Sequence, residues 1–363
     1  MAEMMRNIVP FAATHPGEIL DAELDARGIK QNEFARAIGI STTHLNEFIK
    51  GKRNMNAELA IKFESELGIS SDIWMRLQSN YEVTLARIRE RDEKEQEAAG
   101  ILELIGQIVD LITIKKEYNY EGNKAAPFLE WFKKNFHVKT PSDLNASMVE
   151  LFRKSEKANT EELMARTWVL IAREHASRIS VRGSFLREKG EEIANGLSYI
   201  LHENENTIAR VTDFLSENGI RFCIVKKVKN AAIDGYSEII DGIPTIVLTQ
   251  RIDRIDNFAF SLMHEMGHIN LHLLPKERKG CLTFAEHEKN KEEREADLYA
   301  SSHLIPDSLW KSAPESRPIP SLVQKKYSLW AQQNKLNKWI VLGRVSHESG
   351  IYAFTKDRTR KVN

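Results

Sequence analysis

The amino-acid sequence predicts a multidomain protein that is mostly α-helical and has an α+β part toward its C-terminus. Between residues 15 and 82, short amphipathic segments end at glycines, the residue favoured just past a helix C-terminus. Residues 82–99 are almost all charged or small. Two runs rich in β-branched residues, at 221–228 and 245–249, predict strands. Strand signals therefore begin only after a long helical stretch.

Composition and charge narrow the class of protein. The 363 residues allow two or three domains, and 42% hydrophobic content is ordinary for a soluble globular chain. Every apolar run is shorter than the roughly 18 residues needed to cross a bilayer, and the first residues lack a signal-peptide core. Two distant cysteines favour a reducing compartment. We expect a cytoplasmic protein with no membrane partner. The 52 basic and 52 acidic residues identify no partner by themselves.

Composition shifts divide the chain into five expected parts. The glycines and proline at 235, 242 and 244 are assigned to loops between the strands of a small antiparallel sheet. No chemical motif is found in the middle region, whose default role is packing or partner binding. The parts are an N-terminal five-helix domain (1–82), a charged helical linker ending near Gly100 (83–100), a helical middle region (101–204), the α+β domain (205–312) and a C-terminal extension packed on it (313–363).

Residues 264–268 read His-Glu-Met-Gly-His inside an apolar run that predicts a helix. His264 and His268 are four residues apart, so both imidazoles project from one face, a spacing that suits two of the four tetrahedral positions of Zn²⁺. Glu265 lies about 100° round the helix, close enough to accept a proton from a metal-activated water. A helical histidine pair can also be one core residue beside one surface residue, so the motif alone leaves this choice open.

A catalytic zinc site needs a third protein ligand, and the helical pattern at 292–306 supplies candidates. Glu293 is the expected ligand. Asp297, one turn later on the same face, would hydrogen-bond a histidine ligand and fix its tautomer. Two small residues, Ala296 and Ala300, would let the two helices approach closely. A Glu-rich stretch is usually a solvated helix face, but here the residues that follow Glu293 become apolar and small.

Other side chains compete for the metal in this interpretation. Glu295 is the main rival ligand; it lies about 200° round the helix from Glu293, so both cannot face one ion. His272 follows His268 by one turn and is more readily explained as an interfacial histidine. His287 and His347 are weaker rivals, and His347 could also lie near the site and stabilise a developing oxyanion.

The pattern His264-Glu265-Met-Gly-His268-Ile-Asn-Leu-His272, followed by Glu293-Arg-Glu-Ala-Asp297, resembles the ImmA/IrrE family of metallopeptidases over roughly 205–310. That family pairs His-Glu-x-x-His with a later Glu-x-x-Ala-Asn/Asp. The resemblance implies a zincin-like fold and a zinc endopeptidase that cleaves transcriptional repressors in a regulated way. The target would be a partner protein, or the chain itself near the exposed segment 82–99.

A second motif lies near the N-terminus. Residues 31–38, a turn at Gly39-Ile40 and residues 41–49 predict a helix-turn-helix in which Ser41 caps the second helix. Residues 30–62 carry six Lys/Arg against three Asp/Glu, the sign expected beside phosphates. A dimerising helical bundle is the alternative. The expected DNA contacts are Gln31 to a phosphate, Thr42, Thr43 and Asn46 to base edges, and Lys50, Lys52 and Arg53 to the phosphate backbone.

Residues 15–82 resemble HigA-type antitoxins of the Xre-like repressor class. The resemblance rests on His15-Pro-Gly-Glu-Ile-Leu20, residues 35–40, Gly51-Lys-Arg53 and the segment 67–78. It implies a homodimer on a palindromic double-stranded DNA operator and, often, neutralisation of a cognate toxin. The second helix of the motif carries no arginine, where many such proteins have one or two.

Together these patterns favour a bifunctional regulator, a DNA-binding repressor or antitoxin fused to a zinc endopeptidase. The alternative is an antitoxin or transcription factor whose metal site is structural or sensory and that cuts nothing. Glu265 argues against this alternative, because a structural zinc site does not need a carboxylate placed for proton transfer.

Overall fold

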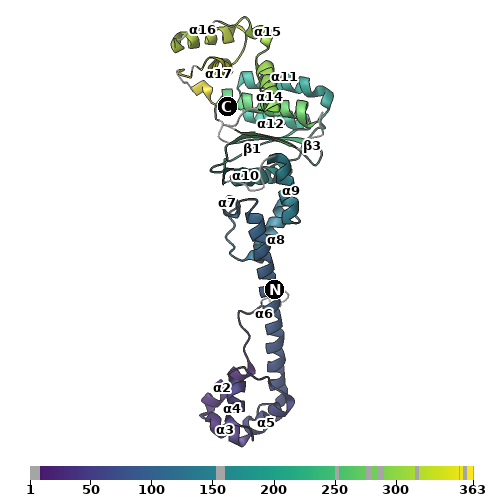
Figure 1. The fold of residues 1–363 in the computed structure, drawn as a ribbon, viewed down its shortest axis with the longest axis vertical. Helices are drawn as coiled ribbons and strands as arrows, with labels where there is room; N and C mark the ends of the chain where they lie inside the picture. The colour runs from purple at the N-terminus through teal and green to yellow at the C-terminus, as the bar shows by residue number, and fades with distance from the viewer. Residues whose placement is uncertain are drawn as a thin grey trace. The chain divides into compact units, whose positions relative to one another are not determined.

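The computed structural model divides the chain into two compact units, Met1–Gly100 with Lys124–Leu129, and Ile101–Asn123 with Glu130–Asn363. Figure 1 labels their helices and strands. None of the helices described is long and apolar enough to cross a membrane. The residues described are 9–152, 160–249, 253–274, 280–284, 290–314, 319–350, 352–354 and 358–362.

The first unit contains the predicted five-helix domain. Leu45, Phe48, Phe63 and Trp74 are fully buried at its centre. Local signals set the helix ends: the Ser41 hydroxyl accepts a hydrogen bond from the His44 backbone N–H at 3.1 Å. Its helices are α2 (Pro16–Arg27), α3 (Gln31–Ala37), α4 (Thr42–Ile49), α5 (Ala57–Leu67) and the start of α6 (Ser71–Gly106). Gly28, Gly39, Gly51 and Gly68 all have φ between 66° and 69°, as predicted for residues that end helices.

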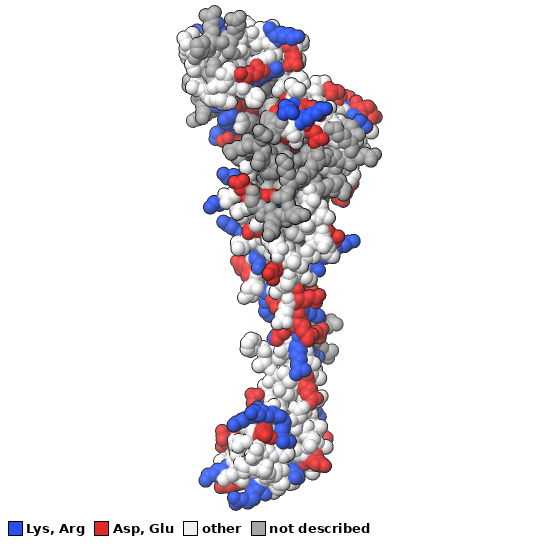
Figure 2. Space-filling view, viewed as in Figure 1, with Lys and Arg blue, Asp and Glu red and all other residues white. Residues whose placement is uncertain are grey.

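The charged linker is helical, as expected, but it does not end near Gly100. Helix α6 runs without a break from Ser71 to Gly106. A glycine inside a helix costs only about 1 kcal/mol relative to alanine, too little to end a long helix that continues into apolar residues. Figure 2 shows acidic and basic side chains interspersed along this helix, and Glu90 pairs with Lys94 at 2.7 Å one turn on.

The second unit begins with helices and continues into a four-stranded sheet, counted in the described residues. The sheet order is β1-β3-β2-β4; β1 pairs with β3 in parallel and the other pairs are antiparallel. The helices before the sheet are α7 (Leu111–Glu117), α8 (Ala125–Phe136), α9 (Pro141–Phe152), α10 (Thr160–Ser177), η1 (Arg187–Lys189), α11 (Gly190–Glu203) and α12 (Thr207–Glu217). The strands are β1 (Arg221–Val225), β2 (Ile233–Ile240), β3 (Ile243–Thr249) and β4 (Gly280–Phe284).

The sheet corrects the sequence-based prediction in two ways. It is mixed and not purely antiparallel, because β3 returns from the β2 hairpin to lie beside β1 in the same direction. Gly235 and Pro244 were assigned to loops but lie inside β2 and β3; of the three breakers only Gly242 is in a turn, with φ 76°. Pro244 is tolerated because it is the second residue of β3 and precedes the ladder with β1, which begins at Thr245.

Alternate residues of β2 face opposite sides of the sheet. Tyr236 and Glu238 point toward α10, where both bond to Arg173 at 3.0 and 2.8 Å. Gly235 and Ser237 therefore point to the other face, where helix α13 (Ile255–His268) lies. In Figure 1, α11, α12 and α14 lie on one side of the sheet and α10 on the other. The helix carrying the His-Glu-Met-Gly-His motif is thus packed directly on the sheet.

Helix α13 continues as a π-helical turn, η2 (Ile269–Leu273), and packs against α14 (Lys291–Leu304). A Cβ atom on Gly267 would lie 3.1 Å from the Tyr299 side chain, and Ala296 and Ala300 are fully buried. Small residues therefore let these helices approach closely, as predicted. The C-terminal helices join the same apolar core: α15 (Asp307–Trp310), α16 (Pro320–Gln333), α17 (Lys338–Ser349) and η3 (Arg358–Arg360) follow.

Candidate functional site

Two imidazoles and one carboxylate meet between α13 and α14. The Nε2 atoms of His264 and His268 are 3.0 Å apart. The carboxylate of Glu293 lies 3.3 Å from His264 Nε2 and 3.2 Å from His268 Nε2. Ligands at about 2.0–2.1 Å from Zn²⁺ in a tetrahedron are separated by roughly 3.3 Å, so the three side chains fit a zinc ion with little rearrangement.

Hydrogen bonds and charge prepare this cluster for a cation. The second ring nitrogen of His264, Nδ1, lies 3.0 Å from Asp297 Oδ1. Burial disfavours the charged form of His264, yet its bonds to Asp297 and Glu293 prevail and raise its pKa to about 9. Burial likewise opposes ionisation of Glu293, but the two imidazoles lower its pKa to about 2. In the absence of metal, a proton held on His264 balances the charge of these carboxylates.

Glu265 is buried between α13 and the sheet. Neither of its carboxylate oxygens completes a hydrogen bond with a described residue. Burial raises its pKa, while the imidazoles of His268 and His264 and the nearby hydroxyls of Thr283 and Ser237 act in the opposite direction. A Cβ atom on Gly235 would lie 2.2 Å from Glu265 Oε1, so only glycine leaves room for this carboxylate.

The structure places two further polar residues beside the site. His272 is fully buried, and its Nδ1 lies 2.9 Å from Nδ1 of His268. Its Nε2 lies 2.9 Å from the carboxylate of Glu295. The sequence pattern favoured an interfacial role for His272 and made Glu295 the main rival metal ligand. The repeated four-residue spacing of the three histidines was the signal that could have placed His272.

Two further rivals were His347 and His287. His347 is exposed on α17, and His287 lies outside the described residues. Glu295 faces His272 while Glu293 faces His264 and His268, in keeping with the expectation that the two glutamates could not share one ion.

The side chains predicted to contact DNA lie on α4, at the start of α3 and in the turn after α4. Thr42, Thr43 and the three cations Lys50, Lys52 and Arg53 are exposed, and Asn46 is half-buried. Leu45 and Phe48 on the opposite side of α4 anchor it in the core. The helix thus presents one polar face outward.

Two of the predicted DNA contacts are engaged within the domain. The amide of Gln31 donates a hydrogen bond to Asp21 Oδ1 at 2.7 Å. Arg53 pairs with Glu47 at 2.5 Å, with both side chains partly exposed. Each would have to give up its surface hydrogen bond or ion pair in order to contact a phosphate. We therefore expect Gln31 and Arg53 to contribute less to DNA affinity than Lys50 and Lys52.

Two family models match the chain. A model described as Helix-turn-helix matches residues 20–74, and one described as IrrE N-terminal-like domain, a peptidase family, matches residues 216–329. The chain belongs to the Xre-like helix-turn-helix proteins and carries an IrrE/ImmA-like peptidase domain. The peptidase family is generally metal-dependent, in keeping with the cluster of His264, His268 and Glu293.

Individual relatives match about a fifth of the chain. It is 32% identical over 71 residues to the uncharacterized HTH-type transcriptional regulator YddM of Escherichia coli (strain K12), covering 20% of this chain and 76% of that protein. Virulence-associated protein A′ of Dichelobacter nodosus is 34% identical over 71 residues, or 19% of this chain. The chain spans 62% of that relative's length.

Solved structures similar to a part of this chain include an antitoxin and an antidote protein. The Pseudomonas aeruginosa antitoxin HigA with higBA promoter is 32% identical, covering 23% of this chain and 94% of that one, with a TM-score of 0.22. A putative antidote protein of a plasmid maintenance system from Nostoc punctiforme is 30% identical, covering 23% and 93%, with a TM-score of 0.23.

Proposed function

We propose that this chain is a DNA-binding regulator or antitoxin whose peptidase domain is a zinc endopeptidase that cleaves a regulatory protein. The observation that carries the enzymatic half is the buried carboxylate of Glu265, which completes no hydrogen bond with a described residue. An unpaired buried carboxylate is costly, and it lies beside a His-His-Glu set that fits a cation. A metal held only for structure would need no such group.

The chemistry follows from the positions of these side chains. A zinc ion, when bound, supplies a Lewis acid that polarises the scissile carbonyl and acidifies a water. His264, His268 and Glu293 would hold it, and Asp297 would keep the His264 ring oriented. Glu265 accepts the proton of the attacking water and returns it to the leaving amine. Burial raises the pKa of Glu265 above its ordinary value, the direction that makes a carboxylate a better general base.

The substrate we infer is a separate protein and not the segment 82–99 of the same chain. That segment lies within α6, where each peptide group is held in a helical hydrogen bond. A helix must unwind before its backbone can enter an active site. Ion pairs one turn apart, such as Glu90 with Lys94, oppose that unwinding.

The DNA-binding half would act as a homodimer on a palindromic operator. Thr42, Thr43 and Asn46 would contact base edges from the outward face of α4, while Lys50, Lys52 and Arg53 would contact phosphates. Support comes from the exposure of these residues, of which Asn46 alone is half-buried, and from the similarity to an HTH-type transcriptional regulator.

One comparison tests both halves: the zinc-loaded full-length wild type against Glu265→Gln. Each protein is incubated with extract of the host cell, and new peptide termini are identified by mass spectrometry. We expect Glu265→Gln to keep its zinc and its selection of genomic DNA fragments but to produce none of the new termini. Equal cleavage by both proteins would reject the peptidase mechanism. Absence of cleavage by the wild type would favour a structural or sensory metal site.

A further inference from the structure

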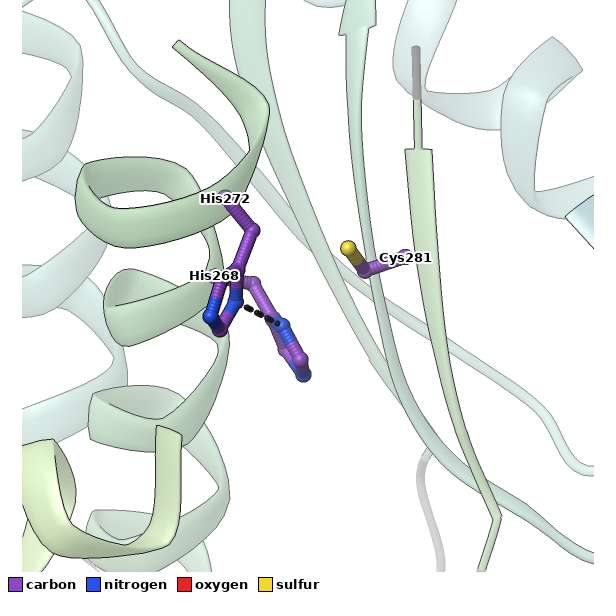
Figure 3. Close-up of side chains that lie close together, drawn as sticks. All are labelled: His268, His272 and Cys281. Carbon is purple, nitrogen blue, oxygen red and sulfur yellow. Dashed lines mark hydrogen bonds between the residues drawn. The ribbon is translucent and has the colours of Figure 1, made fainter. Parts of the chain in front are cut away.

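Beside the peptidase ligands lies a second set of metal-ligating side chains. His272 follows His268 at the same four-residue spacing that separates His264 from His268, and Cys281 lies across from them on β4. His268 and His272 are fully buried and Cys281 is 3% exposed. One ligand atom from each lies within 4.8 Å of the other two. Figure 3 shows the sulfur on the side of β4 that faces the two imidazoles.

Strand register explains why the thiol is there. Cys281 pairs with Ser237, and cross-strand partners share a face of the sheet. Because Ser237 is on the α13 face, Cys281 is too. The Nδ1 atoms of His268 and His272 are 2.9 Å apart. Ligands of a tetrahedral metal with N and S donors are separated by roughly 3.3–3.8 Å, so only small shifts are needed.

The hydrogen bonds of His272 prepare it as a ligand. An ionised carboxylate only accepts, so Glu295 fixes the ring proton of His272 on Nε2, at 2.9 Å. The lone pair of His272 is then on Nδ1, which faces His268. A carboxylate behind a histidine is the usual support for a metal-bound imidazole.

We propose that His268, His272 and Cys281 form a second site, for a thiophilic cation, that competes with the peptidase site for His268. The two sets share His268, and each contains a second histidine. The third ligand is a carboxylate in the peptidase set and a thiolate in the second set, and a thiolate favours softer cations. A neutral imidazole has one lone pair. His268 uses Nε2 in the peptidase set and Nδ1 in the second set, so it serves one cation at a time.

The consequence rests on the proposed function. A thiophilic cation at the second site displaces the thiol proton of Cys281 to solvent. The ring proton of His268, donated from Nδ1 to His272 in the metal-free chain, moves to Nε2 when Nδ1 binds the cation. The peptidase set then keeps only His264 and Glu293 and releases its zinc. The site is thus an inhibitory metal switch inside the peptidase domain.

The binding test uses Cd²⁺ and the reduced, metal-free full-length chain. We expect ultraviolet Cd–thiolate charge-transfer absorption that saturates at one Cd²⁺ per chain. The chain has two cysteines, at 223 and 281. Cys223→Ser is the matched control and must retain the absorption, which assigns it to Cys281 without relying on a variant at that position; Cys281→Ser must lose it. His272→Gln should weaken Cd²⁺ binding at least about tenfold.

The competition test begins from the zinc-loaded chain. Added Cd²⁺ should release one Zn²⁺ per Cd²⁺ bound, followed with a chromophoric zinc indicator, while Cys281→Ser holds its zinc at the same Cd²⁺ concentration. Absence of thiolate absorption, or its loss in Cys223→Ser, overturns the site. Simultaneous binding of both metals with unchanged zinc affinity overturns the competition.

Failure of the two proposals can be told apart. Glu293→Gln removes the peptidase set but leaves the second set, so its Cd–thiolate absorption should persist. A chain that gives this absorption but never cleaves protein supports the second site and rejects only the proposed peptidase function. A chain that cleaves protein but gives no such absorption rejects only the second site.

Discussion

In the helix-turn-helix unit, most residues expected to touch a partner are exposed, on α4 and in the turn after it, while Gln31 and Asn46 are half-buried. In the peptidase unit, the two histidines expected to touch a metal are buried, and both lie within bonding distance of the partly exposed Glu293. An exposed contact residue needs only a scaffold that presents it, and its replacement costs the fold little. A buried polar residue needs a partner for each of its atoms, so its position depends on distant parts of the chain. Substitutions should therefore act locally and additively in the first unit but spread through a network in the second.

The largest expected effect comes from a residue that is not polar at all. Gly235→Ala places a methyl group 2.2 Å from Glu265 Oε1 and must displace that carboxylate. Loss of a general base lowers rates by about 10²–10⁴-fold, so protein cleavage should fall by that factor while zinc content is unchanged. Ser237→Ala, on the same face of the same strand, adds no atoms and should retain most activity. Wild-type cleavage by Gly235→Ala would show that Glu265 is not confined as described.

Next in size is the loss of the third metal ligand. Glu293→Gln removes the charge that lies beside both imidazoles, and zinc affinity should fall by more than about 100-fold, beyond the effect of an outer hydrogen-bond partner. Glu292→Gln is the matched control one residue away on α14. Equilibrium dialysis with a zinc chelator measures both. Equal affinities in the two variants would remove Glu293 from the site.

Asp297→Asn should weaken zinc binding by about 10–100-fold, because Asp297 holds His264 through Nδ1. It should also change the pH dependence. In the metal-free chain the pKa of His264 is about 9, above its ordinary 6.5, so zinc must displace a proton below pH 9 and its affinity rises as pH increases toward that value. Removing the charge of Asp297 lowers this pKa and flattens the rise.

The same shift affects stability. Because the folded-state pKa of His264 is raised, its contribution to the stability of the metal-free chain is fully present below about pH 6.5 and is lost as the pH rises through about 9. Thermal melts of metal-free wild type and Asp297→Asn between pH 6 and 10 measure it. A wild-type melting temperature that shows no such decline relative to the variant would contradict the assignment.

The smallest expected effect is in the exposed unit. Lys52→Ala should reduce the slope of log affinity for DNA against log salt by about one and leave the fold intact. Lys62→Ala on α5 makes the same change of charge outside the expected contacts and should leave that slope unchanged. Identical slopes for the two variants would place the DNA elsewhere on the domain.

The same contrast explains which features of the fold and the site could be predicted from the sequence. Glycines, the Ser41 cap and helical spacing are local signals, and they were enough to predict the five helices. The pair His264 and His268 is likewise local, and Glu293 followed from the periodicity of one further helix. The meeting of these side chains depends on the packing of α13 against α14, to which only the small residues 296 and 300 pointed.

The features that the sequence did not predict depend on contacts between residues far apart in the chain. Strand β2 contains Gly235, Ser237 and Glu238 and lacks the β-branched run of β3, so it was assigned to a loop. Gly235 leaves room for the carboxylate of Glu265, which lies on α13. β4 is a short edge strand that no local pattern indicated, and with it Cys281 and Thr283 were missed. The bond between His272 and Glu295 joins two elements whose relative rotation no sequence period specifies.

The close approach of α13 and α14 at Gly267 has a consequence for local unfolding of the peptidase domain. His268 and Glu293 lie on either side of β4 in the chain, so a cation bound by both closes a loop around that strand, as a disulfide would. Such a clip lowers the entropy of the open chain and stabilises the closed one by mass action. Amide hydrogens of β4 should exchange more slowly with deuterated water when zinc is present, and removing zinc should free that edge strand first.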